Sequence, residues 1–214
     1  MSDLFPERFE TARLRFERVG LDTVDTLDVY PYYSTEAGIE QATRYMTWEP
    51  HQVPEETWEF VRAVGEQAEA GDGKLYALYP KAGEDGTEVP GAGEFAGTAG
   101  LHPDWDQRSV TFGMWLRKPF WGRGYSGERA DAFVTLAFDR LDLDLVAVTV
   151  LDENDQSKRA IEKYVGRWGG QHDGYFPNLD THGDEPASVH RYSITREQYE
   201  AADVTVDLTI HDRP

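Results

Sequence analysis

The sequence predicts a single α/β domain (residues 1–214) with a mixed central sheet of about seven strands and flanking helices. In the second half, short β-branched runs alternate with amphipathic stripes in the order strand, helix, strand, helix, which favours parallel pairing of the two strands. In the first half, two apolar runs lie on either side of a Gly-rich loop, as in an antiparallel hairpin. A chain of 214 residues is long enough to bury a substantial core.

The first half is expected to begin with a short strand at Leu14–Phe16 that extends toward Val19. Residues 21–71 follow a helical pattern, clearest in residues 54–71, where a proline opens the segment and a glycine closes it. The core-facing stripe of that helix is predicted to be Trp58, Val61, Val64 and Ala68. Next, residues 74–80 and 95–102 are expected as strands that flank the Gly-rich loop of residues 83–97.

The second half opens with an alternating strand at residues 109–116 (SVTFGMWL). A β-branched strand, LVAVTV, is expected at residues 145–150, followed by a helix from about residue 156 to 165. Two further strands, roughly residues 169–176 and 189–194, close the sheet. The helix before LVAVTV has apolar residues at i, i+3, i+4, i+7, i+8 and i+11, namely Ala130, Phe133, Val134, Ala137, Phe138 and Leu141.

The composition excludes several classes of function. Forty acidic residues face 21 basic ones, which gives a formal net charge of −19, and only five of the bases are lysines. Such a surface repels nucleic acids and anionic membranes, so neither is expected as a partner. The acids are spread along the chain between apolar residues, unlike an acidic interaction tail. Few lysines among many dispersed acids are typical of halophilic proteins from a high-salt cytoplasm.

The absence of cysteine excludes disulfides, thiolate metal sites and a cysteine nucleophile. The six histidines show no metal-ligand spacing, so no metal is expected. There is neither an apolar run of about eighteen residues nor a recognisable signal peptide at residues 1–10. These observations predict a soluble cytoplasmic protein.

The segment that indicates chemistry is PFWGRGYSG, residues 119–127, between a predicted strand and the long helix. Gly122 and Gly124 lack a Cβ atom, so the backbone can turn sharply and approach a ligand closely. The turn leads into a helix N-terminus, where unpaired N–H groups and the helix dipole favour an anion such as a pyrophosphate. Many strand–helix turns, however, use a G-x-G pair for geometry alone. The segment matches neither the P-loop nor the Rossmann fingerprint.

These residues resemble the GNAT N-acetyltransferases, in the RimJ/RimL branch that acetylates ribosomal-protein N-termini. The acetyl-CoA motif of that family is [Q/R]-x-x-G-x-[G/A], and residues 121–126 read W-G-R-G-Y-S. Similar segments follow the order of the family from about residue 11 to 200. They are TARLR at 11–15, TRYMTW at 43–48, GTAGLH at 97–102 and NDQSKR at 154–159 with Glu162 and Lys163.

The resemblance implies acetyl-CoA as acyl donor and direct transfer of the acetyl group to an amine within a ternary complex. The acceptor is left open between a protein N-terminus, a polyamine and another small amine, and a homodimer is left open as well. Asn154 equally suits a helix N-cap, and the two roles are compatible. The positions that match the cofactor-binding residues of the family are Leu116, Arg117, Gly122, Arg123, Gly124, Tyr125, Ser126, Gly127, Asn154 and Ser157.

The catalytic residues are less well defined, because the sequence departs from the family at two positions. Thr111 and Ile161 stand where many members carry a glutamate and a tyrosine. Ser157 is the candidate proton donor to the departing thiolate, although a first-turn helix serine is an equally good interpretation. The candidate bases are Glu94, His102, His172 and Asp173. The departures keep open a second hypothesis, a non-catalytic acyl-CoA-binding or regulatory module of the same fold.

Overall fold

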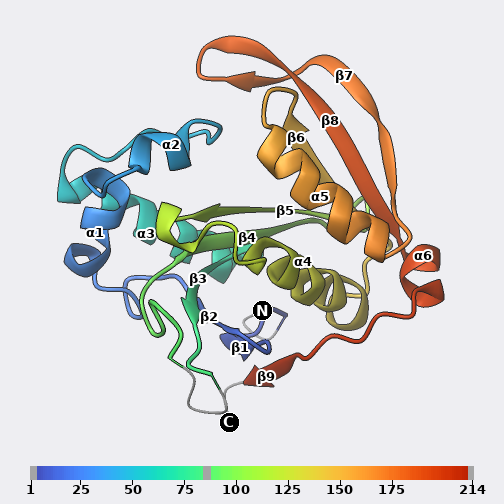
Figure 1. Cartoon of the computed structure of the whole chain (residues 1–214), viewed down its shortest axis with the longest axis horizontal. Coiled ribbons are helices and arrows are strands. Elements are labelled where there is room, and N and C mark those ends of the chain that lie inside the picture. The colour runs from blue at the N-terminus through green and yellow to red at the C-terminus, as the bar shows by residue number, and fades with distance from the viewer. Residues whose placement is uncertain (1–3, 84–87, 212–214) are drawn as a thin grey trace.

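The computed structural model describes residues 4–83 and 88–211. Their strands form one mixed sheet in the order β7-β8-β6-β5-β4-β3-β2-β1-β9 (Figure 1). All neighbouring pairs are antiparallel except β5 and β6, which are parallel. The strands are β1 (Arg8–Glu10), β2 (Leu14–Arg18), β3 (Lys74–Pro80), β4 (Gly97–Asp104), β5 (Ser109–Leu116), β6 (Leu145–Leu151), β7 (Gln171–His182), β8 (Glu185–Thr195) and β9 (Thr209–His211).

The predicted α/β class and mixed sheet are confirmed, with nine strands among the described residues instead of about seven. The two additional strands, β1 and β9, are three residues each and pair with one another at the sheet edge. After the last helix, the chain runs back to β9, beside the N-terminal strands (Figure 1). Segments this short carry too little alternation to be recognised in the sequence. Part of the predicted loop, residues 84–87, lies outside the described residues.

Helices cover both faces of the sheet. One apolar cluster lies under α4 and α5, and a second lies under α1 and α3. The helices are α1 (Thr26–Ser34), α2 (Ile39–Thr43), α3 (Pro54–Ala70), α4 (Tyr125–Thr135), which continues as a π-helical segment (Leu136–Arg140), α5 (Asp155–Arg167) and α6 (Arg196–Ala201). In the described part of the chain, no helix is long and apolar enough to cross a bilayer.

The predicted core stripe is correct for α4 and partly wrong for α3. All six predicted residues from Ala130 to Leu141 are buried. In α3, Val61 is buried, but Trp58 is 43% exposed and packs under the guanidinium of Arg62. Thr57 takes the buried position instead, and its hydroxyl bonds to His51 Nδ1 at 2.7 Å. The buried face therefore runs through positions 57 and 61, and the large apolar residue beside it remains outside.

The sheet splits between its two parallel strands. The ladder joins Ser109 to Leu145 and ends where Thr111 faces Ala147. Beyond that point β5 continues along β4 to Leu116, while β6 continues along β8 to Leu151. The facing edges of β5 and β6 are consequently unpaired with each other. The N-termini of α4 and α5 lie on the side of this opening, and the β7–β8 hairpin projects past it (Figure 1).

Candidate active site

A cleft of about 920 Å³ follows the split from the N-terminus of α4 to that of α5. It brings together every residue predicted to bind the cofactor except Arg117. Leu116 lies at the end of β5, and its carbonyl accepts a hydrogen bond from Trp121 Nε1 at 2.8 Å. The tryptophan of the WGRGYS motif thus ties the glycine turn to the end of the strand. The lining is completed by the end of α2, by the segment that follows it (residues 44–46) and by α5.

The glycine turn leaves the start of α4 open. Gly122 and Gly124 have φ angles of 73° and 79°, in the left-handed region that favours glycine. Gly124 is the N-cap residue, and no side chain of the described residues caps the helix. Free N–H groups at the start of a helix attract an anion through both hydrogen bonding and the helix dipole. The turn therefore has the geometry expected for a pyrophosphate cradle.

Arg13, in the connection between β1 and β2, fixes this turn. Its Nη1 donates to the carbonyl oxygen of Arg123 at 2.9 Å, and its Nε donates to Glu128 Oε2 at 2.7 Å. Glu128 also accepts from Thr11 Oγ1 at 2.6 Å. The TARLR segment, which the sequence analysis assigned to the opening of the fold, thus anchors the candidate cofactor loop.

Cations without a carboxylate partner gather at the cleft. Most arginines and lysines of this acidic chain lie within 4.0 Å of a carboxylate oxygen, as Arg167 does with Asp131 at 2.8 Å. Within residues 4–83 and 88–211, all but one of the cations that lack such a partner line the cleft or the cavity that continues from it. A polyanionic ligand would neutralise this patch. The members of the patch, all in the cleft, are Arg44, Arg123, Arg159 and Lys163, whereas Arg129 lines only the cavity that continues from the cleft, and the exception is Lys118.

The side chain of Arg117 has a structural role. It is buried, and its Nε donates to Glu36 Oε1 and Oε2 at 2.9 and 2.8 Å. Its guanidinium also lies 3.8 Å from the centre of the Tyr32 ring. These contacts hold the chain between α1 and α2 against the end of β5. Glu94, a predicted base, lies 3.6 Å from the same guanidinium and does not line the cleft.

Asn154 and Ser157 lie at the start of α5. Asn154 Oδ1 accepts the backbone N–H of Ser157 at 3.1 Å, which confirms the predicted N-cap. Ser157 lines both the main cleft and a second cavity of about 240 Å³ that continues from it into the split. A residue at this junction faces the place where a thioester would pass from the cofactor side to the acceptor side.

The second cavity contains site residues that the sequence analysis did not select. Tyr164 and Arg129 line its inner wall, and Asp180 and His182 of β7 line its outer wall. At its mouth Tyr45 donates from its hydroxyl to the carbonyl oxygen of Glu153 at 3.2 Å, which joins the segment after α2 to the loop before α5. Burial raises the pKa of Tyr164 to about 12, although the nearby guanidinium of Arg129 acts in the opposite direction.

Three further candidate bases lie away from both cavities. His102 is exposed and packs beside Gly73 and Gly100. His172 bonds through Nε2 to Nδ1 of His190 at 2.9 Å. Asp173 pairs with Arg191 at 2.6 Å. The strand that carries two of these residues, β7, reaches the second cavity four to six residues beyond its predicted end at residue 176, at Asp180 and His182.

Solved structures share this fold at low sequence identity. A GCN5-related N-acetyltransferase from Brucella melitensis matches with a TM-score of 0.73 and 18% identity, over 92% of this chain and 82% of that chain. The RimL ribosomal L7/L12 alpha-N-protein acetyltransferase matches with a TM-score of 0.67 and 17% identity, over 87% and 94% of the two chains. A spermidine N-acetyltransferase from Vibrio cholerae, in complex with CoA and spermine, matches with a TM-score of 0.65 and 14% identity, over 87% and 98%.

No curated protein matches the sequence at a significant level. The family model of the acetyltransferase (GNAT) domain, in contrast, matches residues 13–164, which include the glycine turn, the split between β5 and β6 and the start of α5. This match extends over more than half of the chain and includes the cleft that the sequence resemblance predicted. The chain belongs to the GNAT acetyltransferase family.

Proposed function

We propose that the cleft binds acetyl-CoA and that the enzyme transfers its acetyl group to a primary amine, either a protein N-terminus or a small amine. The uncapped N-terminus of α4, in a cleft lined by cations that have no carboxylate partner among the described residues, carries this proposal, because a coenzyme A molecule presents several phosphate charges. The WGRGYS turn and the flanking motifs support a place in the RimJ/RimL branch. Membership of an acetyltransferase family favours an enzyme over the alternative of a non-catalytic module.

Different residues along the split between β5 and β6 would bind the cofactor, polarise the thioester and donate to the sulfur. Acetyl-CoA supplies the thioester whose acetyl group is transferred. The first-turn N–H groups of α4 would hold its pyrophosphate, and Arg159 and Lys163 on α5 would contact its other phosphate. Backbone N–H groups on the unpaired edge of β5 would polarise the thioester carbonyl. Ser157 would donate to the sulfur as the amine attacks, and no covalent enzyme intermediate is required.

The acceptor amine would enter through the second cavity. Its outer wall carries His182 and Asp180, the groups on β7 that can accept a proton or stabilise a cationic amine. We therefore assign amine binding to this wall, with His182 as the base. Tyr45, at the cavity mouth, would help to exclude water while the amide bond forms.

An acceptor screen tests the proposed function. We expect that protein incubated with acetyl-CoA and a panel of peptides with free N-termini, polyamines and amino sugars releases coenzyme A thiol with at least one amine, and that mass spectrometry finds the acetylated product. Acetyl-CoA binding by calorimetry, without thiol release on any amine, would instead support the non-catalytic module. The His182→Gln variant should lower kcat with little change in acetyl-CoA affinity, because glutamine cannot take the proton that the amine loses.

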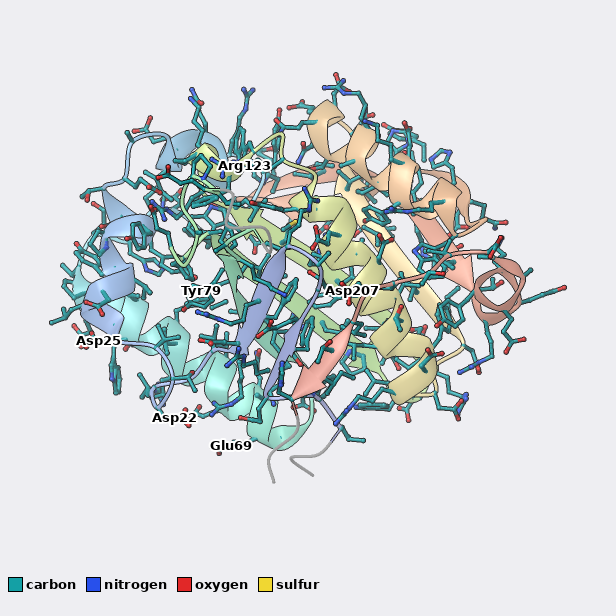
Figure 2. All side chains as sticks on the ribbon, turned by 60° about the horizontal axis from the view of Figure 1, so that its bottom comes forward. Asp22, Asp25, Glu69, Tyr79, Arg123 and Asp207 are labelled. Atoms are coloured by element: carbon teal, nitrogen blue, oxygen red, sulfur yellow. The ribbon has the colours of Figure 1, made fainter. Side chains whose placement is uncertain are left out.

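The dispersed negative charge leads to a proposal about salt. Figure 2 shows carboxylate oxygens around the outline of the molecule, with Asp22, Asp25 and Glu69 labelled toward one edge, and also on the face turned to the viewer, where Asp207 is labelled. At about 0.01 M salt the Debye length is about 30 Å, comparable to the molecule, so most of these charges repel one another. At about 1 M salt it is about 3 Å, and only immediate neighbours interact. The mean hydropathy of −0.63 leaves little apolar burial to offset the repulsion.

We therefore expect the melting temperature to rise as KCl increases from 0.05 to 3 M at fixed pH, as in a halophilic protein. The charge balance of 40 acids and 21 bases drives this effect, because folding brings the excess acids closer together. Differential scanning fluorimetry measures it directly. A melting temperature that stays constant or falls across the series would overturn the halophilic assignment and leave the acetyltransferase assignment in place.

A further inference from the structure

Arg129 is a buried cation whose side chain lines the second cavity. It lies on α4 one turn after Ser126 and is 3% exposed. Within the described part of the chain, its Nε and Nη1 atoms have no hydrogen-bond partner and no carboxylate lies within 4.0 Å. Its guanidinium carbon lies 4.7 Å from the ring centre of Phe112 and 5.5 Å from that of Phe133.

A buried guanidinium without a carboxylate partner is stabilised when an anion binds beside it. Arginine remains charged at every physiological pH, and an unpaired charge in a protein interior costs several kcal/mol. The two aromatic rings offset part of this cost, since a cation over an aromatic ring is attracted by the ring's quadrupole. The hydroxyl of Tyr164, on the same wall, is also buried without a hydrogen-bond partner among the described residues. Both side chains thus contribute to the wall of one small cavity, and they lie close enough to interact electrostatically with each other.

The other buried arginine at the split shows what a structural role looks like in this protein. Arg117 meets both carboxylate oxygens of Glu36 and the backbone of Phe95, so its charge and donors are matched within the chain. Arg129 has no such carboxylate. Arg117, which has a structural role, is therefore paired with a carboxylate within the chain, whereas Arg129 lines the cavity without one.

The position of the cavity indicates which molecule would bring the anion. Ser126, Asn154, Ser157 and Tyr164 line both this cavity and the cofactor cleft, so a group attached to the thiol end of the cofactor reaches it directly. Phe112 follows Thr111, the last residue of β5 that pairs with β6, so Arg129 lies at the closed end of the split. The acceptor side, in contrast, carries the carboxylate of Asp180, which would repel a second anion there.

We propose that this cavity binds the carboxylate of a dicarboxylic acyl group, such as malonyl or succinyl, carried on coenzyme A, with Arg129 and Tyr164 as its contacts. The inference rests on the proposed use of the cleft as a coenzyme A site. The side chains of Phe112, Val148 and Ile161 give the cavity apolar walls for a short methylene chain. Its volume of about 240 Å³ corresponds to several water molecules at about 30 Å³ each, which is enough for this group.

The reaction remains an ordinary acyl transfer. The bond between the acyl carbon and the coenzyme A sulfur breaks, a bond from that carbon to the amine nitrogen forms, and the proton lost by the amine ends on the thiol. The distal carboxylate takes no part in bond exchange and is carried unchanged into the product amide. Arg129 is therefore a specificity-determining residue for the donor, which the enzyme would accept in addition to an acetyl group.

Binding of stable thioether analogues tests the proposal without knowledge of the acceptor. S-(3-carboxypropyl)-CoA and the matching carboxamide differ only in the terminal charge. By calorimetry on the full chain, we expect the carboxylate to bind about tenfold or more tightly, because a hydrogen bond to a charged group contributes about 1.5–3 kcal/mol. Equal affinities of the two analogues would overturn the proposal. This comparison uses the wild-type protein, so it does not depend on a variant that folds.

Two variants test whether Arg129 is the residue that distinguishes the carboxylate analogue from the carboxamide. Arg129→Met should remove the difference between the two analogues while leaving S-ethyl-CoA affinity unchanged. Its melting temperature without ligand should stay level or rise, since an apolar residue replaces an unpaired buried charge. Arg159→Met, at the cleft, should weaken all three analogues equally. If Arg129→Met preserves the preference for the carboxylate, the assignment to Arg129 is wrong. If S-ethyl-CoA itself does not bind to the wild type, the proposed function fails, and this inference falls with it.

A turnover assay separates donor from acceptor. With an amine found in the acceptor screen, succinyl-CoA should give a product whose mass contains the succinyl group, and Arg129→Met should lower kcat/KM for succinyl-CoA much more than for acetyl-CoA. An alternative result, in which Arg129→Met affects only amines that bear a carboxylate, would assign Arg129 to the acceptor and overturn the donor proposal.

Discussion

Gly124→Val is expected to abolish coenzyme A binding, the largest effect we expect for a single substitution in this protein. Gly124 has a φ of 79° and is the N-cap of α4. A β-branched residue avoids this left-handed conformation, so the turn must rearrange and the first N–H groups of the helix must reorient. A Cβ atom at this position would also lie 3.4 Å from Arg13 Nη2, the side chain that anchors the turn.

Thermal and calorimetric measurements detect the loss. A ligand at a hundredfold excess over its Kd stabilises the native state by about 2.7 kcal/mol, so acetyl-CoA should raise the melting temperature of the wild type clearly. The Gly124→Val protein should show no such shift, and calorimetry should show at least a hundredfold weaker binding.

A matched control separates backbone strain from loss of the site. Gly71 has a similar φ of 84° at the C-terminus of α3, with nothing within 4 Å of a Cβ atom and no place in the cleft. Gly71→Val should lose comparable stability without ligand and keep the full acetyl-CoA shift. Normal coenzyme A binding by Gly124→Val would show that the pyrophosphate lies elsewhere.

Local patterns in the sequence were sufficient to predict the central unit of the fold. The βαβα order and the stripe of α4 follow from periodicities of two and 3.6 residues, and both are confirmed. The three-residue strands β1 and β9 are held by pairing between the two ends of the chain, which no local window contains. In α3, periodicity gave the helix, but it could not decide that Thr57 rather than Trp58 meets the sheet, because both positions lie near the edge of the same face.

The cofactor-binding residues were more predictable than the catalytic residues, because most of them form one local segment of the sequence. Gly122 to Gly127 are contiguous, and their role depends on backbone geometry that glycine itself encodes. The second cavity, in contrast, is assembled from widely separated segments, from Tyr45 to Val189. Arg117 shows what the sequence could not predict. It follows the end of the predicted strand as expected, but only the three-dimensional structure shows that Glu36 holds its side chain in the core. Likewise, Arg129 has no motif, and its meaning depends on the absence of a carboxylate around it in the described structure.

Ser157→Ala is the second large effect that we expect. Ser157 lies where the cofactor cleft meets the second cavity, in the first turn of α5. If its hydroxyl donates to the sulfur as the thioester breaks, kcat should fall about 10²-fold, in the range of general acid catalysis, with little change in acetyl-CoA affinity. Steady-state kinetics with calorimetry on the same preparation measures both quantities. The backbone N–H of Ser157, not its side chain, bonds to Asn154, so the helix cap should survive the substitution.

The Tyr164→Phe variant is the control that shows whether a fall in kcat is specific to Ser157. Tyr164 is another hydroxyl residue that lines both cavities, and it is almost fully buried. Burial holds its pKa at about 12, well above that of a thiol, so full proton transfer from Tyr164 to the thiolate would be uphill. A serine hydroxyl is a still weaker acid, so either residue would act mainly by hydrogen bonding to the sulfur as charge develops there. A fall in kcat confined to Ser157→Ala assigns that donor to Ser157. A fall in kcat confined to Tyr164→Phe would show that Tyr164 is the hydrogen-bond donor to the sulfur and that Ser157 is a structural residue of the helix start. The criterion in both cases is a lower kcat with an unchanged affinity for acetyl-CoA, as expected for the residue that contacts the sulfur.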